Sequence, residues 1–154
     1  MTDLASLVSR LVLGTAQVGQ SYGIANTSGQ PDAGLVAEIL SEGRALGVEV
    51  LDTGAAYGMS EAVLGRAGLK GWKVITKIPP LGDICPSKAA QVARETVMAS
   101  CEKLGIARLH GVLLHNAEDA TGPAGPALIE TLMSLQDEGL TEQTGLSIYR
   151  GSDM

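Results

Sequence analysis

Short apolar segments alternate with segments of helical periodicity along the whole sequence, and this alternation limits the possible folds more than any other feature. Between the apolar runs, hydrophobic residues recur at three- and four-residue steps, as they do in amphipathic helices. The predicted order is therefore β-α-β-α-β-α-β-α-β. The five apolar runs of strand length are residues 11–15, 48–51, 72–77, 109–114 and 145–149.

Strict alternation with short connections implies parallel strands joined by right-handed crossovers. The predicted strands are apolar on both faces, which is typical of parallel strands covered by helices. Neither GxGxxG nor GxxxxGK[ST] occurs in the sequence, which disfavours a doubly wound nucleotide-binding sheet. We therefore expect an α/β fold of the (β/α)8 TIM-barrel type. The barrel is expected to be incomplete, with about five β/α units, because such barrels need about 250 residues.

Four longer helices are predicted between the strands. Gly47 and Gly139 are expected to end the first and the last of them, and Ser60 is expected to cap the second. A loop rich in Gly, Ser, Asn and Gln precedes the first. The predicted helices cover residues 32–46, 61–66, 87–104 and the segment around 128–135.

Composition and charge limit the function. The 154 residues fit one domain, and a net charge of −6 offers no electrostatic footprint for nucleic acid or an anionic membrane. No segment reaches the roughly 20 apolar residues of a membrane span, and the N-terminus does not resemble a signal peptide. Cys85 and Cys101 form no CxxC pair and have no His at metal-ligand spacing. We expect reduced thiols, no metal site and a cytoplasmic location.

Polar side chains stand at the C-terminal ends of four successive predicted strands. Asp52 and Tyr57 follow the second strand, Lys77 the third, His115 the fourth, and Ser147 lies in the fifth. Each has an ordinary structural explanation, such as a turn carboxylate, a surfacing lysine or a core histidine. In a parallel barrel, however, these ends converge on one pocket. Their joint placement therefore predicts a site more strongly than any single residue does.

The chemistry of this set is coherent. A phenol is a weak acid at neutral pH, with an unperturbed pKa of about 10. A nearby ammonium favours the phenolate, a carboxylate can hold the ammonium, and an imidazole can orient a carbonyl. Such a site protonates an alkoxide as it forms, which is what reduction of a carbonyl by a hydride donor requires. Positioned proton transfer of this kind contributes roughly 10²–10⁴-fold to a rate.

The sequence resembles the aldo-keto reductases over residues 10–149. The resemblance is most specific in the Asp-x-x-x-x-Tyr-Gly motif with a following Ser-Glu pair. Further matches occur at the Lys and the His that follow in order. The matching segments are Leu13–Gln17, Tyr22–Asn26, Asp52–Gly58, Ser60–Gly65, Ile75–Lys77, Ser100–Gly105, Leu113–His115 and Gly145–Ser147.

The resemblance implies NADPH-dependent reduction of an aldehyde or ketone to an alcohol. In the roles of the family, Tyr57 is the proton donor, Lys77 stabilises its phenolate, Asp52 pairs with Lys77, and His115 orients the carbonyl. The residues implied in cofactor binding are Gly14, Thr15, Asp52 and Ser147. An Asn often follows this Ser in the family, whereas Ile148 stands there in this sequence.

Two hypotheses follow from the resemblance. In the first, residues 1–154 are a partial aldo-keto reductase barrel domain that lacks the last three β/α units, and the activity belongs to the complete barrel. In the second, the chain is a non-catalytic half-barrel that associates with itself or with another chain through open sheet edges. A truncated product that folds poorly is a third possibility. The identity of the carbonyl substrate and the choice between NADPH and NADH stay open.

Overall fold

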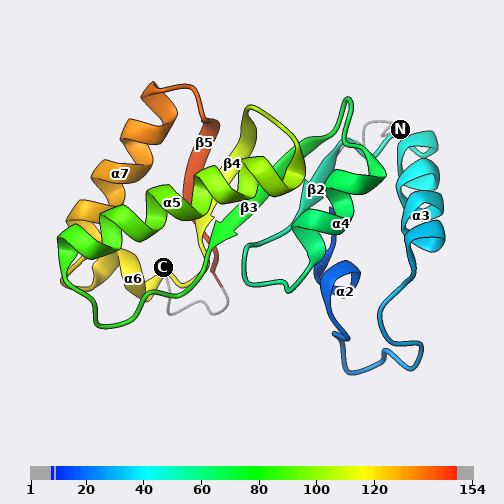
Figure 1. Cartoon of the computed structure of the whole chain (residues 1–154), viewed down its shortest axis with the longest axis horizontal. Coiled ribbons are helices and arrows are strands. Elements are labelled where there is room, and N and C mark those ends of the chain that lie inside the picture. The colour runs from blue at the N-terminus through cyan, green and yellow to red at the C-terminus, as the bar shows by residue number, and fades with distance from the viewer. Residues whose placement is uncertain (1–7, 9, 149–154) are drawn as a thin grey trace, which may run out of the picture.

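Five parallel strands form one sheet in the order β1-β2-β3-β4-β5. The computed structural model describes residue 8 and residues 10–148. Each strand pairs with the next one along the chain, so every connection crosses from one strand to its neighbour (Figure 1). The strands are β1 (Val12–Gly14), β2 (Val50–Asp52), β3 (Lys73–Ile78), β4 (Leu109–Leu114) and β5 (Thr141–Leu146).

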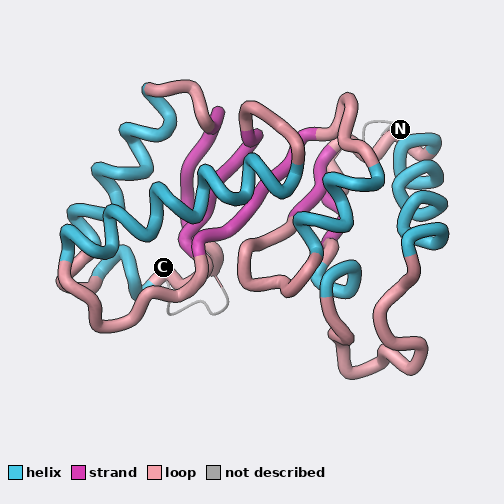
Figure 2. Tube along the Cα trace, viewed as in Figure 1, coloured by secondary structure: helices cyan, strands magenta, loops and turns pink. Residues whose placement is uncertain are grey.

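Helices follow the strands in alternation, as the sequence predicts (Figure 2). Consecutive long helices contact one another, α3 with α4, α4 with α5 and α5 with α7. The α/β fold of parallel barrel type is thereby confirmed. The helices are α2 (Ala16–Gly19), α3 (Ala33–Ala45), α4 (Ser60–Ala67), α5 (Pro86–Leu104), α6 (Glu118–Thr121) and α7 (Gly125–Asp137).

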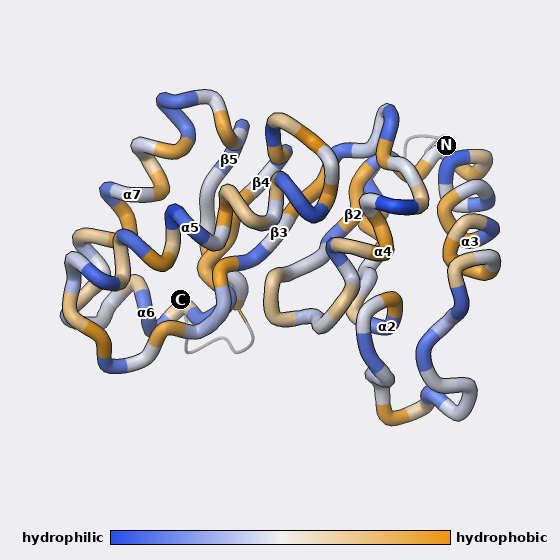
Figure 3. The backbone as a smooth tube through the Cα atoms, in the orientation of Figure 1, coloured by the Kyte–Doolittle hydropathy of each residue, from blue (hydrophilic) through white to orange (hydrophobic). Residues whose placement is uncertain are grey.

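The core is aliphatic and lies between the sheet and the long helices. Hydrophobic residues run along β2, β3 and β4 (Figure 3). Leu51 and Val112 of the strands are fully buried, as are Ala89 and Val97 of α5 and Leu128 of α7. Full burial of an aliphatic side chain contributes about 1.5–3 kcal/mol. In α3, by contrast, only Val36 and Leu40 are buried, and the side chains of Leu35 and Ile39 are exposed.

The register places the two faces of the sheet in different surroundings. Leu51 pairs with Val74, and Thr76 pairs with Val112; all four are buried on the helix side. Because side chains alternate along a strand, Asp52 and Lys77 point to the opposite face. That face corresponds to the interior of a barrel. The alternation therefore puts the predicted site residues on the side of the sheet that the helices leave open.

The predicted position of the last strand is wrong. Residues 145–149 were expected to form it, whereas β5 covers Thr141–Leu146. Thr141 to Thr144 are polar, but β5 pairs on one side only and most of its residues are partly or fully exposed. Polar residues at this edge therefore cost little free energy of desolvation, and a search for apolar runs does not detect the strand. Tyr149 lies outside the described residues, and Ser147 follows β5 instead of lying within it.

Several helix boundaries also differ from the prediction. Ser60 is the first residue of α4 and makes no capping hydrogen bond, because its hydroxyl is bonded to Thr15 and Thr53 instead. Asp32 does cap α3 through the Leu35 amide. The short helices α2 and α6 were not predicted, since four residues are too few to show a period. Gly105 and Gly139 follow α5 and α7 with the positive φ angles expected of helix stops.

None of the helices in the described part of the chain is long and apolar enough to cross a bilayer.

Candidate active site

A partly buried ion pair joins the ends of β2 and β3. The Lys77 ammonium donates to Asp52 Oδ1 at 2.6 Å and to the Thr53 carbonyl oxygen at 2.9 Å. The Lys77 side chain is 6% exposed, while the Asp52 side chain is 32% exposed. A buried cation needs such partners, because desolvation is costly without them. The carboxylate therefore holds the ammonium at a fixed place on the open face of the sheet.

Tyr57 and His115 lie against this ion pair. The Lys77 ammonium is 5.0 Å from the centre of the Tyr57 ring. The His115 ring meets the Tyr57 ring edge to face, with centroids 5.6 Å apart and planes at 88°. The four residues Asp52, Tyr57, Lys77 and His115, which come from three strand ends, are thus brought together as the sequence pattern predicts.

The environment of His115 keeps its imidazole neutral over a wider pH range. Burial lowers the pKa of His115, and the nearby Lys77 charge lowers it further, whereas Asp52 acts in the opposite direction. His115 Nδ1 is buried and has no hydrogen-bond partner among the described residues. A neutral imidazole carries one N–H donor and one acceptor. His115 can therefore donate a hydrogen bond without carrying a charge.

A pocket of about 350 Å³ opens beside Asp52 and Tyr57. Gly14 contributes to its wall, and a Cβ placed on Gly14 would project into open space. Of the residues predicted to bind a cofactor, Gly14, Thr15 and Asp52 line this pocket, and Ser147 does not. The Ser147 amide donates to the Leu114 carbonyl, next to the strand end that carries His115. The lining residues are Gly14, Thr15, Ala16, Gln17, Tyr22, Gly23, Asp52 and Tyr57.

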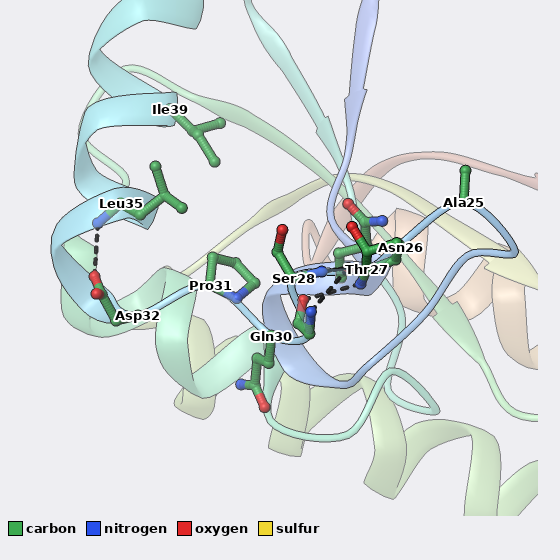
Figure 4. Close-up of a pocket in the computed structure, with 11 residues that line it drawn as sticks. Ala25, Asn26, Thr27, Ser28, Gln30, Pro31, Asp32, Leu35 and Ile39 are labelled. Atoms are coloured by element: carbon green, nitrogen blue, oxygen red, sulfur yellow. Dashed lines mark hydrogen bonds between the residues drawn. The ribbon is translucent and has the colours of Figure 1, made fainter.

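The loop after α2 forms a second wall of this region. Its shape depends on Asn26, whose side-chain oxygen accepts from the amides of Ser28 and Gly29 (Figure 4). The Asn26 amide group donates to the carbonyls of Tyr22 and Gly29. A further pocket of about 420 Å³ lies between this loop and the start of α3. The sequence showed the polar loop but gave no sign of the Asn26-centred turn.

Sequence reasoning missed several buried polar residues behind the site. Thr53, Ser60, Glu61 and Thr76 are each at most 2% exposed. The signals in the sequence were the Ser-Glu pair of the family motif and the prediction of Ser60 as a helix cap, and neither gave the partners that the structure shows. Within the described residues, no group of three or more His, Cys, Asp or Glu side chains could hold a metal ion. Cys85 and Cys101 are free thiols, the first exposed and the second partly buried.

The comparison with known proteins identifies the family. The profile of the Aldo/keto reductase family matches residues 10–154, so the chain belongs to this family. Among curated proteins, D-arabinose 1-dehydrogenase of Saccharomyces cerevisiae is 30% identical over 155 residues, which cover 96% of this chain and 44% of that protein. The chain therefore spans somewhat less than half of the length of this curated relative.

Solved structures agree with this assignment. A Pseudomonas aeruginosa protein assigned as an aldo-keto reductase has 32% identity and a TM-score of 0.74, and the match covers 88% of this chain and 54% of that one. An aldo-keto reductase of Klebsiella pneumoniae, solved in complex with NADPH, has 20% identity and a TM-score of 0.64 over 92% of this chain and 46% of its own. The second likeness shows the fold alone. The chain spans about half the length of these proteins.

Proposed function

We propose that this chain carries the proton-transfer half of an NADPH-dependent carbonyl reductase active site. The observation that carries the proposal is the convergence of the Asp52–Lys77 ion pair, with its 2.6 Å contact, on the ring of Tyr57 beside His115. Membership of the aldo-keto reductase family supports an oxidoreductase activity. The substrate class is an aldehyde or a ketone.

Each residue has a separate role in the proposed reaction. The neutral imidazole of His115 donates a hydrogen bond to the carbonyl oxygen and so orients it. As hydride adds to the carbonyl carbon, the Tyr57 phenol transfers its proton to the developing alkoxide oxygen. The phenolate that remains is stabilised by the Lys77 ammonium, which Asp52 holds in place. Water then reprotonates Tyr57, and the alcohol leaves.

The pocket fits the nicotinamide end of such a cofactor. The open space in front of Gly14 lets a flat ring approach the backbone beside Asp52 and Tyr57. Two aldo-keto reductase structures from Klebsiella pneumoniae, which share the fold, contain NADPH in one case and NADP with acetate in the other, and this supports the choice. NADPH supplies the hydride when bound. We propose that Asp52 contacts its ribose and that Ser147, at the next strand end, binds its carboxamide.

We further propose that residues 1–154 form the first five β/α units of an eight-stranded barrel. The remaining three units would then supply the contacts to the cofactor phosphates, and turnover would belong to the complete barrel. The chain spans only about half of the length of its relatives, and this supports the proposal. A barrel of this type needs about 250 residues.

The test is NADPH oxidation with a panel of aldehydes and ketones, measured for this chain and for a complete barrel that contains it. Tyr57→Phe should lower kcat by roughly 10²–10⁴-fold, because it removes the proton donor. NADPH binding, followed by fluorescence, should be retained, since the ring stays in place. Turnover that is indifferent to Tyr57→Phe would overturn the proposed role of this residue.

A second candidate function is that of a half-barrel that associates through its open edges. Large apolar side chains are exposed at both ends of the sheet, with Leu11 56% and Val12 48% exposed at β1, and Leu146 40% and Ile148 50% exposed at β5. Exposed strand edges favour pairing with another chain. Light scattering distinguishes this candidate, because a monomer at all concentrations with no bound partner contradicts it.

A further inference from the structure

The first two residues of α4 bury polar side chains completely, and neither belongs to the site described above. Ser60 is 0% exposed and Glu61 is 2% exposed. We infer that Ser60 and Glu61 are positioning residues, which fix the separation between the Asp52 carboxylate and the Lys77 ammonium. They do so by tying the ends of β1, β2 and β3 to the first turn of α4. The inference rests on the proposed function in one respect, namely that this ion pair takes part in catalysis.

Ser60 ties β1 and β2 to the helix through buried hydroxyl groups. Its hydroxyl donates to the Thr15 carbonyl at 2.9 Å and accepts from the Thr53 hydroxyl at 3.0 Å. The Thr15 hydroxyl in turn donates to the Asp52 carbonyl at 2.9 Å. The three hydroxyl-bearing residues are at most 2% exposed, so water cannot replace these bonds cheaply. The main chain at Asp52 and Thr53 is therefore linked to α4.

Glu61 ties β3 to the same turn of the helix. One of its carboxylate oxygens accepts from the Thr76 hydroxyl at 2.7 Å. The other is buried without a hydrogen-bond partner among the described residues and lies 3.6 Å from the Lys103 ammonium. A buried carboxylate with so few partners depends strongly on each of them. The hydroxyl of Thr76 thus makes a direct polar contact between β3 and the first turn of α4.

The alternation of side chains carries this constraint to the site. Thr76 points toward α4, and its neighbour Lys77 points to the open face. The Lys77 ammonium bonds both Asp52 Oδ1 and the Thr53 carbonyl. Thr53 also bonds Ser60, so the ion pair and the α4 contacts are connected through these hydrogen bonds and through the main chain of Ser60–Glu61 and Thr76–Lys77. A shift of β3 relative to α4 must therefore change the position of the Lys77 ammonium.

The experiment uses His115 as a reporter and requires no turnover. The sequence has two histidines, so the C2–H signals in a proton NMR titration are resolved, and His115→Gln assigns them. Thr76→Val removes the hydroxyl and keeps the shape. The Lys77 charge and burial both lower the pKa of His115. Displacement of β3 weakens both causes, so the His115 midpoint should rise by several tenths of a pH unit.

Three comparisons distinguish a positioning role from a general loss of stability of the fold. Thr76→Ser keeps the hydroxyl and should restore the wild-type midpoint. Thr131→Val makes the same chemical change on α7, where the Thr131 hydroxyl donates to the Ala127 carbonyl, and should leave His115 unchanged. The C2–H chemical shift of His110, which contacts Glu142 near the start of β5, should stay constant in all variants.

Ser60→Ala independently tests the contacts of α4 with β1 and β2, and it should also move the titration midpoint of His115 from its wild-type value. The inference is overturned if Thr76→Val and Thr131→Val behave alike, or if Thr76→Ser shifts His115 as far as Thr76→Val does. If Thr76→Val does not fold, an unchanged midpoint in folded Ser60→Ala overturns the inference. The NMR titration needs neither cofactor nor substrate, so it tests the inference separately from the proposed function. If the His115 midpoint shifts as expected but no Tyr57-dependent carbonyl reduction is found, the proposed function is contradicted and the positioning role is not.

Discussion

Replacing Gly19 by alanine tests how closely the fold fixes the position of Tyr57. Gly19 ends α2 and packs against the main chain of the loop that carries Tyr57, where its carbonyl accepts from the Met59 amide. A Cβ on Gly19 would lie 1.9 Å from the Tyr57 carbonyl oxygen and 2.2 Å from the Ser60 nitrogen. Both neighbours are backbone atoms, so no flexible side chain can move aside. The loop that carries Tyr57 must therefore move away from α2.

The size of the effect follows from this distance. An ordinary contact begins at 3.4 Å, so the loop has to move by about 1.5 Å. A misplacement of about 1 Å in an active site can cost about 10²-fold in rate. If the proposed function holds, kcat/KM for carbonyl reduction by the complete barrel should fall by at least about 10²-fold. Alanine is otherwise favoured over glycine within a helix by about 0.5–1 kcal/mol, so a loss cannot be attributed to helix propensity.

The assay pairs this variant with Gly43→Ala in α3. A Cβ on Gly43 would lie 3.5 Å from Trp72 and 3.8 Å from Leu13, which are ordinary contacts. The rate is measured as NADPH oxidation by the complete barrel of the proposed function, and the chemical shift of the His115 C2–H reports its contact with the Tyr57 ring. Gly19→Ala should change both quantities, and Gly43→Ala neither. If the two variants give the same rate and the same shift, the reasoning is refuted.

Three further predictions concern charge and packing. Lys77→Met should raise the titration midpoint of His115 in NMR, because the Lys77 charge lowers the pKa of His115 and Asp52 raises it; an unchanged midpoint contradicts the observed geometry. Leu51→Ala should lower the free energy of unfolding by about 2–5 kcal/mol in urea titrations, since Leu51 is 0% exposed. Leu46→Ala, at a position 68% exposed, should change it by no more than about 0.5 kcal/mol. Hydrogen bonds from Arg94 and Ser134 lower the pKa of Glu138 to about 2 from an ordinary 4.5. The stability that the ionised Glu138 contributes is therefore complete above pH 4.5 and is lost as the pH falls toward 2. The urea midpoints of the wild type and of Arg94→Gln should differ by a constant amount above pH 4.5, and this difference should shrink as the pH falls from 4.5 toward 2.

The prediction from sequence succeeded where a local pattern carries the information. The helix of residues 86–104 repeats apolar and small residues at three- and four-residue steps over five turns, so its position could be predicted almost to the residue. The four residues Asp52, Tyr57, Lys77 and His115 could be grouped because parallel strands end at one edge of a sheet. Periodicity failed for β5, which is polar, and for the four-residue helices, which are too short to show a period.

The sequence by itself determined the order of the elements, the parallel sheet and the family, because these follow from hydrophobic spacing and from a short motif. Only the tertiary structure decided that Ser60 bonds Thr15 and Thr53 instead of capping a helix, and that Glu61 receives the hydroxyl of Thr76. These partners are 7 to 45 residues apart. The physical reason is that a hydrogen bond needs two groups within about 3 Å. Which polar groups come that close depends on strand register and on how α4 packs over the sheet, and no local pattern specifies either.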